Sequence, residues 1–343
     1  MGWLTSALFL GWSLGANDAA NIFGTAVASR MVRFRTAAII TTIFVILGGV
    51  IVGPLGVERI GKLGAIDSIS GAFTAALAAA LTVMWMTRLN LPVSTTQAIV
   101  GSALSWSYFA GKSVAWAKLI PIVIAWVASP LLCAVASIVL YYLIAFILKH
   151  VKTHMLVLDA YLRYGLIAVG SYGAWALGGN NMGNVVGVFN GSGIFNDTVI
   201  LGIPFSEARL LSVLGALGIS VGVITYSYGV MITVGGDLVK LDSMTAFIAI
   251  ASEALVLDIF GYLGIPVSSS QALVGAVLGV GLIRGGNTIK LKVLGRIVLG
   301  WIATPVIAAV VCLVALYVVK NVFEQEVVKE YGIAPKVSLQ TSR

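Results

Sequence analysis

The most informative feature of this sequence is how little charge it carries. Of its 343 residues, 10% are charged and 59% are hydrophobic, and the mean hydropathy is +1.03. Ordinary soluble domains contain roughly 25% charged residues. The composition therefore excludes a soluble globular domain and predicts an integral membrane protein. No stretch alternates polar and apolar residues with a period of two, so a transmembrane β-barrel is also excluded.

The sequence is poor in the residues that most enzymes and metal sites need. Its two cysteines, Cys133 and Cys312, lie in apolar helical sequence, where packing is a better interpretation than a disulfide or a metal site. Its two histidines, His150 and His154, lie in a basic segment, and we interpret them as solvated rather than metal-binding. No Ser-His-Asp set and no HExxH motif occurs in the hydrophobic segments, which disfavours a membrane enzyme.

The net charge of +8 comes from Lys and Arg residues in short connections between hydrophobic segments. Cytoplasmic loops of membrane proteins favour basic residues, so these clusters need no nucleic-acid partner. The first residues lack the basic flank of a cleavable signal peptide. We therefore expect the first hydrophobic segment to remain in the protein.

Hydrophobic runs long enough to cross a bilayer, which takes about 20 residues as a helix, recur along the chain. Their backbones must be satisfied internally, so helices are expected throughout. Two glycine-rich segments, 2–29 and 164–196, are long for single helices and are predicted to be broken or re-entrant. In the first half we expect five membrane elements, at 2–29, 36–57, 68–87, 91–109 and 117–148.

Three motifs occur twice, in the same order. PVSTTQAIVGSAL from Pro92 and PVSSSQALVGAVL from Pro266 are identical at eight of thirteen positions. GANDAANIFG from Gly15 matches GGNNMGNVVG from Gly178, and WVASP, further along the chain, matches WIATP. Ordered pairs of this kind predict two homologous halves. The predicted parts are a first repeat at 1–150, a short cytoplasmic linker at 151–159, a second repeat at 160–320, and a tail at 321–343 that should be a short, fading helix.

An odd number of elements in each half would invert the second half relative to the first. The basic residues support inversion when the connection with Arg30, Arg33 and Arg35 is placed in the cytoplasm, because the linker and the basic connection from Arg284 to Arg296 then lie there too. Both termini are then predicted to lie outside. The predicted fold is an all-α polytopic protein of two inverted-topology repeats, crossing the plasma membrane many times.

Each Pro-Val-Ser motif predicts a helix N-terminus. Proline fits the first turn of a helix, and the hydroxyls after it can cap that turn. A helix N-terminus presents free backbone N–H groups and about half a positive charge, so two inverted copies that meet would surround an anion with donors. The alternative is that these hydroxyls only bond back to their own helix or join helices. The candidate substrate ligands are Ser94, Thr95, Thr96, Gln97, Ser268, Ser269, Ser270 and Gln271.

Three ionisable residues lie within the hydrophobic segments, and all are acidic: Asp18, Glu253 and Asp258. A charge at the centre of a bilayer costs about 2.5–3.5 kcal/mol on insertion scales, so such acids usually face a cavity, a partner or an ion pathway. Carboxylate and amide oxygens on one helix face suit a small hard cation. The alternative is a structural role, or simple solvation for Asp258. The candidate cation ligands are Asn17, Asp18, Asn21, Asn180, Asn181, Asn184, Glu253 and Asp258.

The hydrophobic segments contain no Lys or Arg to balance a bound anion. A neutral set of N–H and O–H donors needs positive charge that arrives with the substrate. Cations held by nearby carboxylates would supply it, and the sequence therefore predicts a symporter of an anion with cations.

At these motifs the chain resembles the inorganic phosphate transporter (PiT) family, whose members move phosphate with sodium or protons. The resemblance rests on GANDAAN, PVSTT, GGNNMGN and PVSSS and covers nearly the whole chain. It implies an all-helical inverted-repeat fold with re-entrant hairpins, about twelve membrane helices and a homodimer. It also implies phosphate held between the two Pro-Val-Ser segments and coupled to sodium or protons. The Asn and Asp clusters favour sodium as the coupling ion, and no other cofactor is expected. By this resemblance the phosphate ligands are Ser94, Thr95, Thr96, Ser268, Ser269 and Ser270, and the cation ligands are Asp18, Asn21, Asn181, Asn184 and Glu253.

The chain departs from the family pattern at two places. Gln97 and Gln271 stand where many relatives have histidine, which excludes proton coupling through those positions. Asn180-Asn181 stands where relatives commonly have Asn-Asp, so one expected carboxylate is neutral. We expect import of phosphate with sodium. Proton-coupled phosphate or sulfate symport and an anion channel, with the paired helix N-termini as its filter, stay open.

Overall fold

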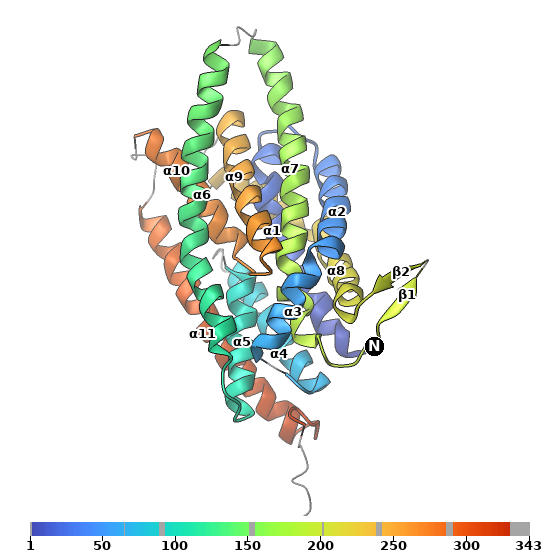
Figure 1. The fold of residues 1–343 in the computed structure, drawn as a ribbon. Coiled ribbons are helices and arrows are strands. Elements are labelled where there is room, and N and C mark those ends of the chain that lie inside the picture. Colours follow the sequence, from blue (N-terminus) through green and yellow to red (C-terminus); the bar gives the residue numbers. More distant parts are fainter. Residues whose placement is uncertain are drawn as a thin grey trace, which may run out of the picture.

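The computed structural model describes residues 2–64, 66–88, 93–150, 155–200, 202–237, 242–285 and 291–329 (Figure 1). This part of the chain is almost entirely helical. The first half contains the 3-10 helix η1 (Gly2–Leu4) and six α-helices: α1 (Thr5–Ala28), α2 (Phe34–Ile51), α3 (Gly53–Gly64), α4 (Ile69–Arg88), α5 (Thr95–Phe109) and α6 (Trp116–His150). The second half contains α7 (Met155–Val186), the 3-10 helix η2 (Gly187–Phe189), α8 (Glu207–Asp237), α9 (Ser243–Tyr262), α10 (Ser269–Ile283) and α11 (Leu291–Asn321).

Six of these helices, α2, α4, α6, α8, α9 and α11, are long and apolar enough to cross a membrane. The prediction of an all-α membrane protein is therefore confirmed, with one small exception. Strands β1 (Thr198–Ile200) and β2 (Ile203–Phe205) form an antiparallel hairpin in which Thr198 pairs with Phe205. About twelve membrane helices were expected, and the described residues contain eleven α-helices.

Segments 2–29 and 164–196 were predicted to be broken or re-entrant. Helix α1 is instead continuous over 24 residues, and α7 over 32 residues, whereas the second segment leaves α7 at Val186 and continues as η2. Their glycines serve close packing instead. A Cβ on Gly15 would lie 2.0 Å from the carbonyl oxygen of Ile219, and one on Gly178 would lie 2.3 Å from that of Val45. These glycines therefore let two helix backbones touch, which the sequence pattern does not distinguish from a kink.

The expected element at 36–57 is in fact two helices. Helix α2 ends at Ile51 and α3 begins at Gly53, with Pro54 in its first turn. Proline lacks the N–H that would continue α2 and restricts the residue before it, so the first helix ends there. Helix α7 begins at Met155, inside the segment that was predicted to be a linker.

Corresponding helices of the two halves run in opposite directions. In Figure 1, α6 rises from the lower end of the molecule to its top, whereas α11 descends from the upper left. Helix α1 begins near the lower end, beside the label N, and α7 begins at the top. Helices of one half also pack on helices of the other half. Helix α5 packs on α11 and α6 on α10, while α1 packs on α8 and α2 on α7.

Two of these contacts between the halves, α5 with α11 and α10 with α6, depend on a glycine that is repeated in both motifs. A Cβ on Gly101 of α5 would lie 2.2 Å from the carbonyl oxygen of Pro305 in α11, and one on Gly275 of α10 would lie 2.1 Å from that of Pro130 in α6. Both glycines belong to the Pro-Val-Ser motifs and both prolines to the WVASP and WIATP motifs. The repeated motifs thus meet in reciprocal pairs across the two halves.

Two helical hairpins, α4–α5 and α9–α10, are closed at their bases by an acid–base pair. Lys112 lies 2.7 Å from Asp67 in the first hairpin, and Arg284 pairs with Asp242 in the second. Burial raises the pKa of Asp242, but hydrogen bonds from Arg284 and Thr245 outweigh the effect of burial, so the pKa lies below its usual value.

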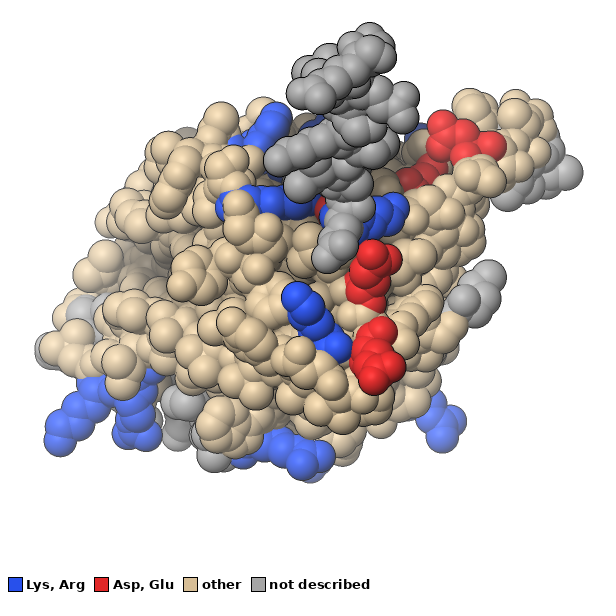
Figure 2. Space-filling model, turned by 90° about the horizontal axis from the view of Figure 1, so that it is seen from below, with Lys and Arg blue, Asp and Glu red and all other residues tan. Residues whose placement is uncertain are grey.

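Seen from below, the surface of the protein carries both acidic and basic side chains (Figure 2).

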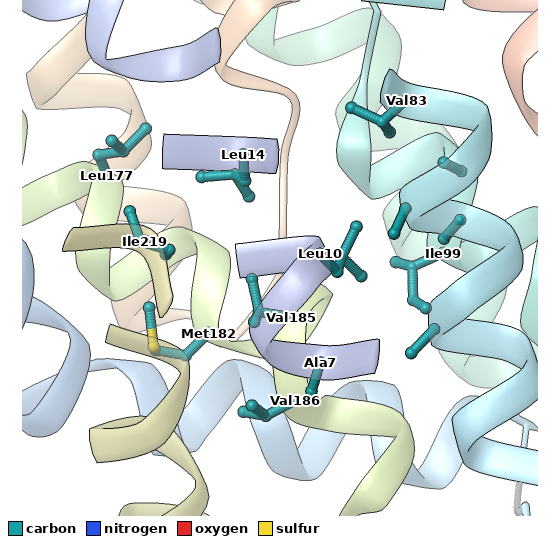
Figure 3. Packing of buried hydrophobic residues seen from close by; sticks show 14 of the residues in the cluster. Ala7, Leu10, Leu14, Val83, Ile99, Leu177, Met182, Val185, Val186 and Ile219 are labelled. Atoms are coloured by element: carbon teal, nitrogen blue, oxygen red, sulfur yellow. The ribbon is translucent and has the colours of Figure 1, made fainter. Parts of the chain in front are cut away.

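A hydrophobic core joins the two halves around α1. Ala7, Leu10 and Leu14 of α1 are part of one buried cluster. It also contains Ile99 of α5, Val185 of α7 and Ile219 of α8 (Figure 3). All of these side chains are buried. Burial of apolar surface inside a membrane protein gives no separate hydrophobic gain over lipid, so close packing and interhelical hydrogen bonds must hold this core together.

The glycine contacts predict a difference between three otherwise equal substitutions. Gly101→Ala and Gly275→Ala each place a methyl group against backbone, which costs about 1–3 kcal/mol by overpacking. Gly295 lies in α11, and a Cβ added to it would have nothing within 4 Å, so alanine there favours the helix by about 1 kcal/mol. Thermal unfolding in detergent should show lower midpoint temperatures for the first two variants and an equal or higher one for Gly295→Ala. Equal midpoints in all three variants would contradict the close packing.

Candidate functional site

The tips of the two hairpins meet inside the protein. The Thr96 hydroxyl at the start of α5 donates a hydrogen bond to the Val267 carbonyl (3.1 Å), and the Ser270 hydroxyl of α10 donates one to the Val93 carbonyl (3.1 Å). Both valines are fully buried. The hairpins occupy the lower and the upper part of the molecule (Figure 1), and two hairpins that fully crossed a bilayer from opposite faces would place their tips about 30 Å apart. Each hairpin therefore ends in the interior.

Serine caps both of the helices that begin at these tips. The Ser94 hydroxyl accepts a hydrogen bond from the backbone N–H of Gln97, and Ser268 accepts one from that of Gln271, each at 3.3 Å. The motifs thus mark helix N-termini, but Pro266 lies two residues before the cap rather than in the first turn. Serine fits the cap better, because its side-chain oxygen satisfies a first-turn N–H. Pro92 lies outside the described residues.

Asp18 lies against the tip of the second hairpin. Its carboxylate accepts hydrogen bonds from the Ser269 hydroxyl (2.6 Å) and from the Asn17 amide (3.1 Å), and its side chain is 2% exposed. Glu253 of α9 is equally buried, and neither of its oxygens has a hydrogen-bond partner. The two acids are close enough to interact electrostatically. No Lys or Arg in the described part of the chain pairs with either acid.

The asparagines of α7 hold the two tips. The Asn180 side chain donates to the Val267 carbonyl (2.8 Å) and accepts from the Val267 N–H (2.9 Å). The Asn184 side-chain amide donates to the Thr96 hydroxyl and to the side-chain oxygen of Asn181 (Oδ1), each at 2.8 Å. The Asn181 amide donates to Leu177 within its own helix (3.0 Å). Both tips are therefore fixed to a single helix by side-chain amides.

Several buried polar atoms around the tips have no partner among the protein groups. A buried polar group without a hydrogen bond costs about 1–3 kcal/mol, so a local concentration of them needs an explanation. A bound ion, anion or water would satisfy them. The unpartnered atoms are Thr95 Oγ1, Gln97 Oε1, Gln271 Oε1, Asn184 Oδ1 and both oxygens of Glu253, and Asn21 Nδ2, about one helical turn from Asp18 on α1, also lacks a partner.

Asp258 lies apart from the other candidate ligands. Its carboxylate accepts hydrogen bonds from the Tyr172 hydroxyl (2.8 Å) and the Trp175 indole (3.1 Å), both on α7. It is half-buried, and none of the hydrogen bonds of the described residues joins it to the tips. No three His, Cys, Asp or Glu side chains gather within the described residues, so any cation at the tips must rely on hydroxyl, amide and carbonyl oxygens as well.

Two groups at the site were missed by sequence reasoning. They are the backbone carbonyls of Val93 and Val267, which accept the reciprocal hydrogen bonds and, for Val267, the Asn180 pairing. The sequence does repeat a valine before the capping serine in both motifs. A pattern of side chains does not show, however, which backbone carbonyls accept hydrogen bonds from the opposing hairpin.

The phosphate transporter family matches this chain in two stretches, residues 14–162 and 150–312. A protein of Methanocaldococcus jannaschii with the name "Putative phosphate permease" is 29% identical over 309 residues, which cover 90% of this chain and 94% of that protein. One of Pyrococcus horikoshii with the same name is 28% identical over 389 residues, covering 90% of this chain and 96% of that protein.

A solved structure has the same fold. It is described as "The sodium-dependent phosphate transporter", and it superposes with a TM-score of 0.80 at 26% sequence identity. The alignment covers 93% of this chain and 99% of the other. The likeness therefore extends over both hairpins and over the helices that hold them.

The contacts of Thr96 predict an unequal effect of two isosteric substitutions. Thr96→Val removes a donor to Val267 and an acceptor for Asn184, and leaving such buried partners unpaired costs about 1–3 kcal/mol. Thr41 of α2 is buried with no partner for its hydroxyl, so Thr41→Val should be neutral or stabilising. Midpoints of thermal unfolding in detergent compare the two variants. A larger loss for Thr41→Val would refute the importance of the contacts between the tips.

Proposed function

This chain belongs to the phosphate transporter family, a family of membrane transporters and not of enzymes, and we propose that it imports inorganic phosphate by symport with sodium ions. The observation that carries this proposal is the meeting of two serine-capped helix N-termini beside two buried acids, Asp18 and Glu253, with which no Lys or Arg of the described residues pairs. One part of this arrangement suits an anion, and the other suits the cations that accompany it.

The first turns of α5 and α10 are the proposed phosphate ligands. The first N–H groups of a helix have no partner within it and carry a partial positive charge, so they bind oxyanions without a basic side chain. Capping by Ser94 and Ser268 uses one N–H in each turn. The Thr95 hydroxyl and the side-chain oxygens of Gln97 and Gln271 lack partners. They are available to phosphate, which can both accept and donate hydrogen bonds near pH 7.

Asp18 and Glu253 are the proposed centre of the sodium sites. Two buried carboxylates repel an anion, and they interact strongly because the interior screens charge poorly. Sodium bound to their oxygens, with help from Asn21, Asn181 and Asn184, removes that repulsion. Phosphate affinity then depends on sodium, which is the thermodynamic requirement for coupled transport. The structurally similar transporter is described as sodium-dependent, which supports this choice of ion.

An inverted repeat with both termini outside is the proposed arrangement in the plasma membrane. The opposite directions of α6 and α11 support the inverted repeat (Figure 1), and so does the place where the two family matches meet, at residues 150–162. The placement of both termini outside rests on the basic connections of the sequence. Each hairpin would then cover the substrate site from one side, as alternating access requires. The homodimer implied by the resemblance remains a proposal, and the mass of the purified transporter in detergent tests it.

Uptake of labelled phosphate into proteoliposomes at fixed pH tests the proposed function. An inward sodium gradient should drive accumulation above equilibrium in the wild-type protein. Asp18→Asn keeps the size of the side chain but removes the charge that attracts sodium, so its uptake should no longer respond to the gradient. Asp258→Asn is the matched control, because Asp258 lies apart from the tips, and it should keep sodium-driven accumulation.

Other outcomes identify the competing functions. Equilibration that ignores the sodium gradient, with no effect of Asp18→Asn, would mean an anion channel. Accumulation driven by a proton gradient in the absence of sodium would mean proton coupling. Competition by sulfate as effective as that by unlabelled phosphate would mean a sulfate carrier. Any of these results refutes sodium–phosphate symport.

A further inference from the structure

The chain after α11 folds back onto the protein. A short helix fading along 321–343 was expected, and this is wrong for residues 322–329, which are not helical. Glu324 adopts a left-handed backbone conformation (φ 51°), and the backbone N–H of Gln325 donates to the Val319 carbonyl (3.1 Å). The chain therefore reverses at Glu324, and we call residues 324–329 the strap.

The strap is joined to the base of the α4–α5 hairpin by four hydrogen bonds. The carbonyl of Val327 accepts from the Trp106 indole (2.8 Å) and from the Ser68 hydroxyl. The carbonyl of Glu326 accepts from the Ser70 hydroxyl, and the backbone N–H of Lys329 donates to the Asp67 carboxylate (3.2 Å). The Val327 side chain itself is 2% exposed. The strap thus occupies a built site and does not lie loosely on the surface.

Gly71 of α4 shows how closely the strap fits. A Cβ on this residue would lie 2.5 Å from the Trp106 indole nitrogen, 2.7 Å from the Ser68 hydroxyl and 2.7 Å from the Val327 carbonyl. Lys112 continues the same network, because it pairs with Asp67 and lies over the Trp106 ring, 5.0 Å from its centre. The strap, the beginning of α4 and the end of α5 therefore form one hydrogen-bonded unit.

The second hairpin has no such attachment among its described contacts. Its base is joined by Arg284 and Asp242, which are both partly exposed. No hydrogen bond of the described residues joins this base to a segment outside the hairpin. The two repeats are therefore unequal at this point, since within the described residues the first hairpin alone is fixed at its base by another part of the chain.

We propose that the strap is a positioning element for the substrate site, an inference that rests on the proposed function of the hairpin tips. Helix α5 connects the strap-bound Trp106 to Gln97 at its other end. A helix is stiff, so a tilt at the base moves the tip. The strap holds the base, and thereby keeps Ser94, Thr95 and Thr96 aligned with the opposing tip. Phosphate affinity consequently depends on residues far from the phosphate.

Equilibrium dialysis of labelled phosphate against purified protein, in detergent with sodium, tests this role. Removing residues 323–343 deletes the strap, whereas removing residues 330–343 retains it and is the matched control. We expect the Kd for phosphate to rise about fivefold or more for the first truncation, as for an ordinary coupling between sites, and to stay at the wild-type value for the second. Trp106→Phe, which loses the indole donor together with part of the ring volume, should raise the Kd by a smaller factor.

Three results would overturn the proposal. The first is an unchanged Kd after removal of residues 323–343, and the second is an equal rise in Kd in both truncations. If removal of residues 323–343 does not give a monodisperse protein, the third is an unchanged Kd in Trp106→Phe. Because the assay measures binding alone, a failure of sodium-driven transport in proteoliposomes is a separate result and refutes the coupling mechanism instead.

Thiol labelling tests the docking of the strap independently of phosphate. Val327 is buried and Gln325 is exposed, and both native cysteines are buried. Val327→Cys should react slowly with a water-soluble maleimide and Gln325→Cys rapidly. Adding Gly71→Ala to the Val327→Cys variant should speed the reaction, because the new methyl group displaces the strap. Equal rates for the two single-cysteine variants would show that the strap is not docked, and would also overturn the proposal.

Discussion

The reciprocal hydrogen bonds between the hairpin tips are the constraint on which this structure depends. Thr96 donates to Val267 and Ser270 donates to Val93, and both acceptors lie in non-helical backbone deep inside the protein. Within a membrane, such backbone is tolerated only where protein or a polar cavity satisfies its polar groups. The hydrogen bonds to the Val93 and Val267 carbonyls come from outside their own hairpins, so each tip depends on its neighbours. The asparagines of α7 then fix both tips to the same helix.

Close contact of helices makes that meeting possible. The hairpin helices reach the interior because α5 lies against α11 and α10 against α6 at glycines that touch backbone directly. A larger residue at Gly101 or Gly275 would push each helix away from its support, and the tips would lose their register. Small residues at helix contacts are the usual solution where lipid offers no hydrophobic drive for association. The packing glycines and the capping serines therefore belong to one arrangement, although they lie in different parts of each motif.

Much of this could be predicted from the sequence, and the exceptions have a physical cause. The repeated Pro-Val-Ser motifs predicted helix N-termini, because capping is a local property of a few residues, but the prediction put the proline rather than the serine at the start of the helix. The continuity of α1 and α7 was not predicted, since a glycine gives the same signal for a kink as for a close helix contact. The strap was not predicted either, because Val327 and Glu326 bind through backbone carbonyls, which every residue possesses.

The acidic residues of the site are distributed unequally between the two hairpins, so the two copies of the motif differ in electrostatics. Asp18 of the first half contacts Ser269 of the second, and Glu253 also belongs to the second hairpin. In the first hairpin, α4 and α5 contain no acid, and Asn181 stands at the position that corresponds to Asp18. Both buried acids therefore lie on the side of α10. On the proposed function, a cation is attracted to that side. Of the two proposed phosphate-binding helix N-termini, that of α5, with the unpartnered Thr95 hydroxyl, is then the less repulsive to an anion. Binding of the cation lowers the electrostatic cost of placing the anion a short distance away. In the proposed mechanism, the acids make the two copies of the motif unequal, and this inequality makes the binding of one ion depend on the other.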